Sequence, residues 1–216
     1  MSITNRAAKA ADQVAHPASQ LMQGKIPGDN ADDKALGHPI HPSTVHWPIA
    51  FLTASFGLTT LSLLPPSFMP TFILPPPATL PALAHYSAGA GVLFAMPSIA
   101  TGLGEAYEMT REQLKAKGNW GTVLSDAWEM KDNAGRKLKM TVKHASMNDM
   151  VVGLAGWNWY LGHKYPTAPL PKVNVWLSAI ALPVLLYAAM LGGKLVYEYA
   201  MGVQRQGSGK EVKKSQ

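Results

Sequence analysis

Four windows of the chain are nearly free of charged residues, and each is long enough to cross a lipid bilayer as a helix. They span residues 45–64, 85–104, 141–162 and 175–193. About 20 helical residues, each rising about 1.5 Å, cross a hydrocarbon core of about 30 Å. The pattern therefore predicts an all-α fold, a four-helix transmembrane bundle whose main partner is the lipid bilayer.

The segments between and around the windows differ in composition. Residues 65–84 are uncharged and rich in proline, which predicts a non-helical connection. Residues 105–139 are mixed in charge, and their first part, EAYEMTREQLKAK, predicts surface helices against the lipid headgroups. We therefore expect a long, partly helical loop between the second and third helices. Residues 1–36 read as a polar N-terminal tail, 37–203 as the four-span domain and 204–216 as a basic C-terminal tail.

Positive charge is confined to one side of the predicted bundle. The chain has 19 Lys and Arg against 13 Asp and Glu, a net charge of +6. Apart from Lys164 and Lys172, every Lys and Arg lies before the first window, beyond the fourth, or between the second window and the first turn of the third. With four crossings these segments share one side, and cytoplasmic segments are the ones that retain positive charge. The chain should therefore be a multi-pass membrane protein with its N- and C-termini on the cytoplasmic side.

Composition excludes several classes of function. The chain has no cysteine, and so no disulfide, thiolate metal site or cysteine nucleophile. Its basic residues are scattered among acidic ones rather than interleaved with aromatics, so we expect no nucleic-acid partner. It also lacks a phosphate loop, a dinucleotide-binding fingerprint and a convincing Ser/His/Asp order, so we do not expect an enzyme.

Polar residues gather where the predicted helices meet the cytoplasmic side. His46 opens the first window, Glu105 follows the second, and His144 and Asn148 lie one helical turn apart in the third. Residues four apart share a helix face, and a face with these side chains avoids lipid by pointing inward. Antiparallel threading brings these positions to the same end of the bundle. The sequence therefore predicts a buried His/Glu/Asn cluster at the inner membrane face.

Three roles fit such a cluster. It can be a hydrogen-bond network that fixes the register of the helices. It can bind haem or a transition metal, with His46 and His144 as the ligands and Glu105 and Asn148 around them. It can also line a path for protons or small solutes. Residue types alone leave all three open.

Two further features bear on partners. The HPIHP stretch reads as a stiff, extended entry to the first helix, and its His38 and His41 are secondary candidates for metal ligands. The helix faces rich in small residues also fit a non-catalytic scaffold that binds another membrane protein.

Four blocks in the same order resemble the family of membrane proteins catalogued as domain of unknown function 2231. They are GHPIHPSTVHWPIAF, GLGE, KHASMN and LGGKLVYEYAMGV, and together they cover roughly residues 37 to 203. The resemblance implies a four-helix membrane domain and no particular activity. It draws attention to a set of residues within these blocks: His41, His46, Glu105, His144, Asn148 and Gly193.

Overall fold

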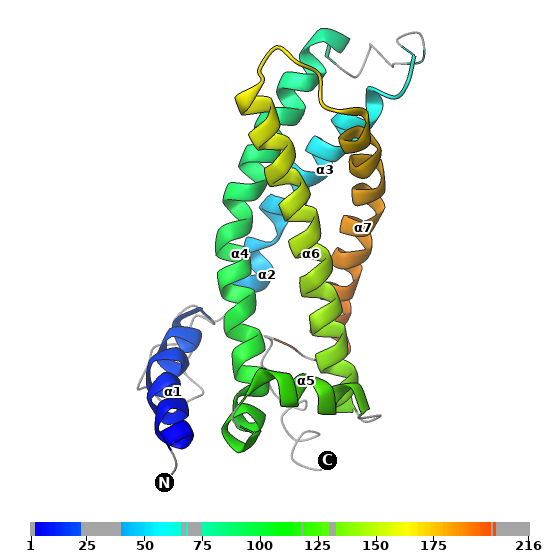
Figure 1. The fold of residues 1–216 in the computed structure, drawn as a ribbon. Helices are drawn as coiled ribbons and strands as arrows, with labels where there is room; N and C mark the ends of the chain where they lie inside the picture. The colour runs from blue at the N-terminus through cyan, green and yellow to red at the C-terminus, as the bar shows by residue number, and fades with distance from the viewer. Residues whose placement is uncertain are drawn as a thin grey trace. The chain divides into compact units, whose positions relative to one another are not determined.

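The fold is mostly helical in the part of the chain that the structure, a computed structural model, describes. That part comprises residues 3–22, 40–65, 68, 75–117, 119–129, 133–199 and 201. No strand occurs among these residues, which confirms the predicted all-α class (Figure 1). The α-helices are α1 (Ile3–Met22), α2 (Ile40–Thr44), α3 (His46–Leu61), α4 (Leu80–Lys117), α5 (Trp120–Glu129), α6 (Asn133–Lys164) and α7 (Lys172–Tyr197), and the 3₁₀ turn η2 (Pro77–Thr79) precedes α4.

The chain divides into two compact units that differ sharply in charge. One unit comprises Thr44–Ser98 and Lys143–Met190, and the other comprises Met1–Ser43, Ile99–Val142 and Leu191–Gln216. We call them the apolar unit and the charged unit. The apolar unit holds few charged side chains, and all of them come from its second segment: Lys143, Asp149, Lys164 and Lys172.

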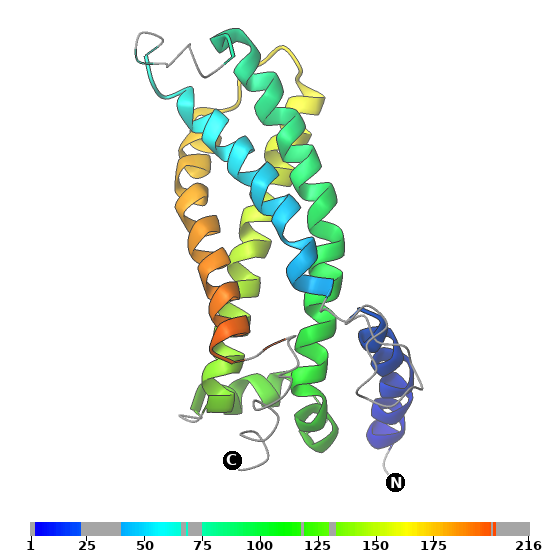
Figure 2. The same ribbon diagram turned by 180° about the vertical axis from the view of Figure 1, so that it is seen from behind.

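The apolar unit is built from α3 and from parts of α4, α6 and α7. Figure 2 shows α3 running between α4 and α7 in this unit. Its buried core draws residues from α3, α6 and α7: Leu52, Phe56, Val151, Ala155, Ala181 and Leu185. Glycines bring α4 close to its neighbours, because a Cβ on Gly91 would lie 2.6 Å from the Leu52 side chain of α3. Small residues at such contacts let membrane helices pack closely.

The charged unit has its own, smaller hydrophobic core, which includes residues of α5. Val123 and Leu138 are buried there, and partly buried side chains from α4 to α6 pack against them: Met109, Leu114, Leu124 and Val142. The side-chain oxygen of Asn119 accepts a hydrogen bond from the backbone N–H of Thr122 at 2.8 Å. Asn119 therefore caps the N-terminus of α5, where backbone donors lack helical partners.

Three local predictions need correction. Leu80–Ala84 are helical rather than part of a non-helical connection, because Pro81 lies in the first turn of α4, where its missing N–H is not needed. Ile40–Thr44 are helical rather than extended, because Pro42 again falls in a first turn and the Ser43 hydroxyl donates to the Ile40 carbonyl oxygen at 2.6 Å. The EAYEMTREQLKAK stretch is helical, but as the continuation of α4 rather than as a separate surface helix.

Length and composition identify two segments of the described residues that are able to cross a membrane. They are Pro77–Arg111, which includes most of α4, and Lys172–Tyr197, which is α7. Helix α3 has 16 residues, and α6 carries several charges in its first turns.

Candidate functional site

His144 and Asn148 form the centre of a polar cluster in the apolar unit, as their spacing on α6 predicts. The Nδ1 atom of His144 lies 2.8 Å from the carbonyl oxygen of Ala188 on α7. The side-chain amide of Asn148 donates to the His144 carbonyl oxygen at 2.8 Å and lies 3.4 Å from His144 Nε2. The cluster therefore joins α6 to α7 through the imidazole ring.

The Ala188 contact determines which nitrogen of His144 is available for chemistry. A carbonyl oxygen only accepts hydrogen bonds, so Nδ1 of the neutral ring must carry the proton. The lone pair of the neutral imidazole then resides on Nε2. Histidines that bind metals or accept protons are commonly held in this way, with the other ring nitrogen bonded to a backbone carbonyl.

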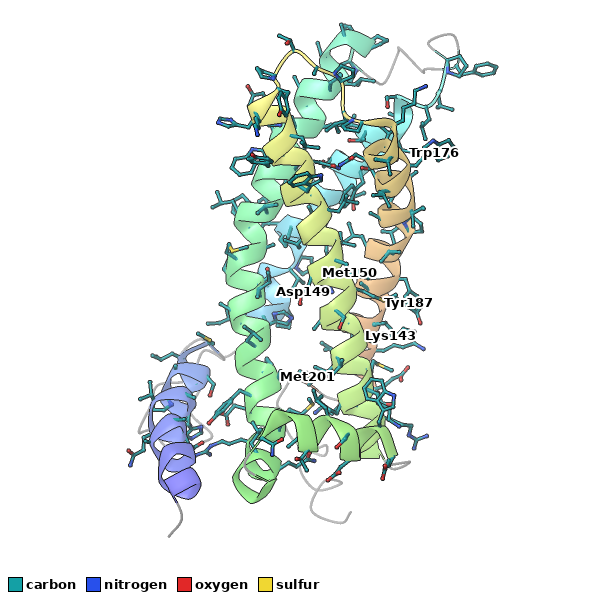
Figure 3. All side chains as sticks on the ribbon, in the orientation of Figure 1. Lys143, Asp149, Met150, Trp176, Tyr187 and Met201 are labelled. Carbon is teal, nitrogen blue, oxygen red and sulfur yellow. The ribbon has the colours of Figure 1, made fainter. Side chains whose placement is uncertain are left out.

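The charged residues that flank His144 point elsewhere. Lys143 donates to the Tyr187 hydroxyl oxygen at 3.0 Å, and its ammonium lies 4.9 Å from the centre of the Tyr187 ring. Asp149 is exposed (Figure 3), and no hydrogen bond or ion pair holds its carboxylate within the described residues. The hydrogen-bonded cluster thus consists of an imidazole, an amide and a backbone carbonyl, and Asp149 acts on the imidazole only through its charge, without a hydrogen bond.

His46 shares the apolar unit with His144 but is not bonded to it. Its side chain is exposed at the start of α3, and among the described residues no hydrogen bond links it to His144 or Asn148. Within the described part of the chain, no group of three or more His, Cys, Asp or Glu side chains is placed to hold a metal ion. Ligation by His46 and His144 stays a prediction.

The remaining predicted residues belong to the charged unit. His41 packs its ring against Gly102, where a Cβ would lie 3.0 Å from the ring, and its Nδ1 is 3.1 Å from the Thr101 hydroxyl. Glu105 is buried, with 6% of its surface exposed. A Cβ on Gly193 would meet nothing within 4 Å. His38 lies outside the described residues, so its candidacy as a ligand stays a prediction.

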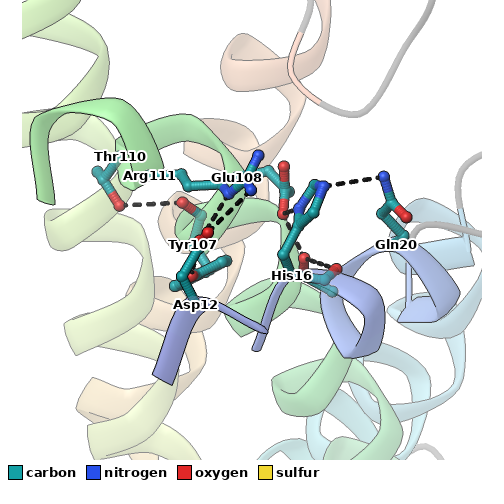
Figure 4. A network of polar contacts seen from close by, with 8 residues as sticks. Asp12, His16, Gln20, Tyr107, Glu108, Thr110 and Arg111 are labelled. Atoms are coloured by element: carbon teal, nitrogen blue, oxygen red, sulfur yellow. Dashed lines mark hydrogen bonds and ion pairs between the residues drawn. The ribbon is translucent and has the colours of Figure 1, made fainter. Parts of the chain in front are cut away.

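A polar network that the sequence analysis did not predict holds α1 to the end of α4 in the charged unit (Figure 4). Arg111 donates to both carboxylate oxygens of Asp12, at 2.7 and 3.0 Å, and the Tyr107 hydroxyl donates to one of them at 2.7 Å. His16 Nδ1 lies 2.7 Å from a carboxylate oxygen of Glu108, to which the Ser19 hydroxyl also donates. Residues read as a polar tail therefore include a docked helix.

A second unforeseen network lies in the interior of the apolar unit. Asn158 donates to the Ser178 hydroxyl oxygen at 3.0 Å, Asn174 donates to the Asn158 side-chain oxygen at 2.7 Å, and Ser178 donates to the Asn174 carbonyl at 2.8 Å. All three side chains are buried. The available signal was Asn158 inside the third window and Asn174 directly before the fourth, since polar side chains between membrane helices usually bond across them.

Apolar windows, a nearly charge-free unit and polar groups paired between its helices define a helical membrane protein. A family model described as "Predicted membrane protein (DUF2231)" matches residues 37–205, and the chain belongs to this family. The matched region contains all four sequence blocks, and with them His41, Glu105, His144 and Asn148. Neither a curated protein nor a solved structure matches the chain.

Proposed function

We propose that the chain crosses the bilayer four times, through α3, α4, α6 and α7, and that it binds a proton reversibly at His144 as part of a proton path. The crossing by α3 and α6 goes beyond what their length and composition alone support. It draws support from the surface of the apolar unit, where large apolar side chains are exposed on all four helices: Trp47, Leu93, Met150, Trp157, Trp176, Ile180 and Leu186. Exposed apolar side chains in such number suit a lipid environment.

The ends of the apolar unit support the same topology. Trp157 stacks on Tyr160 with ring centres 5.5 Å apart, near the end of α6 that Lys164 closes. Trp and Tyr concentrate where a membrane meets water. Helix α3 is about 24 Å long at 1.5 Å per residue, so we expect local thinning of the bilayer around it. Most Lys and Arg, together with both termini, then lie on the cytoplasmic side.

The observation that carries the proton hypothesis is the hydrogen bond from His144 to the Ala188 carbonyl. It fixes the ring and leaves Nε2 as a base, and histidine is the side chain whose charge changes between about pH 5 and pH 8. Ionisable groups within membrane-spanning segments commonly mark proton or ion paths. The Ala188 carbonyl accepts from Nδ1 in both protonation states of the ring, so protonation at Nε2 leaves this hydrogen bond in place.

Proton flux into sealed vesicles tests this hypothesis. The purified chain is reconstituted with a pH-sensitive dye inside, and a pH step or potassium diffusion potential is applied. We expect flux that rises as the pH falls from about 8 to 5, because more Nε2 atoms are then protonated. His144→Gln should abolish it. The matched control is His163→Gln, which changes an exposed histidine near the other end of the same helix. No flux, or equal flux in both variants, would contradict the proposal.

The same hydrogen bond favours a second candidate, a haem or metal ligated by His144 Nε2. A histidine held through Nδ1 by a carbonyl is a common arrangement for an axial ligand. The visible spectrum and metal content of protein purified from a haem-producing host decide between the candidates. A haem absorption band that His144→Gln removes would favour ligation. A colourless, metal-free protein that still conducts protons would rule it out.

A further inference from the structure

The apolar unit contains a single acidic residue, Asp149, and it points away from the core of that unit. The core side of α6 carries Val151, Ala155 and Asn158, all of them buried. Asp149 is exposed (Figure 3), and no hydrogen bond or ion pair holds its carboxylate within the described residues. It lies six residues beyond Lys143, about 9 Å along the helix, which places it in the hydrocarbon core if α6 crosses the membrane.

An unpaired carboxylate in contact with lipid is costly, and no basic side chain of the described residues forms an ion pair with Asp149. The surface around it is shaped to receive a helix. Ala145 and Gly153 lie four residues to either side on the same face, and both are exposed. A Cβ on Gly153 would meet nothing within 4 Å. Small residues at this spacing let a second helix approach the backbone closely.

The charges available at the depth of Asp149 decide whether a second copy of this chain can be the partner. A second copy inserted in the same orientation brings its own Asp149 to the same depth, so two carboxylates would face each other. Its nearest cation, Lys143, bonds to Tyr187 and lies nearer the inner end of α6, while Lys164 and Lys172 lie at the opposite ends of α6 and α7. A second copy therefore offers no Lys or Arg at the depth of Asp149.

We propose that the face formed by Ala145, Asp149 and Gly153 binds a transmembrane helix of another membrane protein, one that carries Lys or Arg at the depth of Asp149. This inference rests on the proposed crossing of α6. The basic side chain pairs with the Asp149 carboxylate, and the small residues bring the two backbones together. Interhelical polar contacts in membranes commonly involve such groups.

A designed helix serves as the probe, and the chain's lack of cysteine allows clean cross-linking. Gly153→Cys is co-expressed with a polyleucine transmembrane helix that carries one mid-membrane lysine and a cysteine one turn away. We expect disulfide yield about tenfold above that of a probe with leucine in place of lysine. Adding Asp149→Asn should remove the difference. Leu186→Cys, at an exposed position of α7, is the matched control and should not distinguish the probes.

Three results would overturn the inference: equal yields for the two probes, a preference that survives Asp149→Asn, or predominant Gly153→Cys homodimers, which would assign the face to a second copy. Labelling from outside the cell at Ala168→Cys, in the connection after α6, is measured in the same membranes. If Ala168→Cys is not labelled, the proposed topology has failed. If it is labelled and the lysine probe shows no preference, the docking inference alone has failed.

Discussion

Among single residues, Asn158 is hydrogen-bonded to two other buried polar residues of the apolar unit. Its amide donates to Ser178 and accepts from Asn174, and its side chain is 5% exposed. Substitution removes two hydrogen bonds at once and leaves the Asn174 amide without its acceptor. Buried groups left in this state cost more than the bond itself contributes.

We therefore predict that Asn158→Ala destabilises the protein by about 1 to 2 kcal/mol. Thermal unfolding in mild detergent, followed by circular dichroism, measures the loss. Met150→Ala, on the exposed side of the same helix, is the control and should unfold at the wild-type temperature. An unchanged midpoint for Asn158→Ala would show that the network contributes nothing to stability.

At the residue scale, a contact was predicted correctly where the spacing of two residues on one helix determines it. His144 and Asn148 are four apart on one helix, and the structure bonds them. The second partner of His144 is a backbone carbonyl 44 residues away. Every residue type has a backbone carbonyl, so the sequence does not indicate which one accepts this hydrogen bond. The two asparagines of the buried network lie in different helices, so their pairing depends on a register that neither window specifies.

At the scale of elements, reciprocal contacts bring α4 and α6 together in the apolar unit. His85 of α4 covers Gly162 of α6, and Trp159 of α6 covers Gly89 of α4. A Cβ on Gly162 would lie 2.5 Å from His85 Nδ1, and a Cβ on Gly89 would lie 2.7 Å from the Trp159 indole nitrogen. Because each glycine lacks a side chain, a large ring of the partner helix can pack against its backbone.

Gly162→Ala should force His85 or the helices apart and lower the unfolding temperature. The expected cost is about 1 to 3 kcal/mol, the usual range for overpacking. Gly153→Ala on the same helix is the matched control, because its Cβ meets nothing within 4 Å and alanine favours helix by about 1 kcal/mol. The control should unfold at or above the wild-type temperature. Equal unfolding temperatures for the two variants would show that the close contact between Gly162 and His85 does not affect stability.

The elements that were not predicted, α1 and α5, are stabilised mainly by contacts between residues that are distant in the sequence. Helix α1 pairs Asp12 with Arg111 and His16 with Glu108, and no local sequence pattern predicts pairs between residues 99 and 92 positions apart. Helix α5 is 10 residues long, below the length at which helices persist alone, and depends on the packing of Val123. Long apolar windows were readable because their hydrophobicity is local.

For the whole molecule, the division into two compact units follows the distribution of charge. The apolar unit contains the greater part of each of the four nearly uncharged windows, and the charged unit contains most Lys and Arg. Hydrophobicity and charge thus predicted the helical class, whereas residues 37–203 were expected to form one domain. Hydrophobicity and charge did not specify side-chain pairing within either unit, which depends on packing geometry that composition does not record.

Cysteine accessibility tests the four-crossing topology most directly, because the native chain has no cysteine. Single cysteines replace Ser125, exposed on α5, and Ala168, exposed in the connection between α6 and α7. A membrane-impermeant maleimide is added to intact cells and, separately, to permeabilised cells. The four-crossing topology predicts that Ala168→Cys is labelled in intact cells and that Ser125→Cys is labelled only after permeabilisation. Labelling of both from outside, or recovery of the chain in the soluble fraction without detergent, would contradict it.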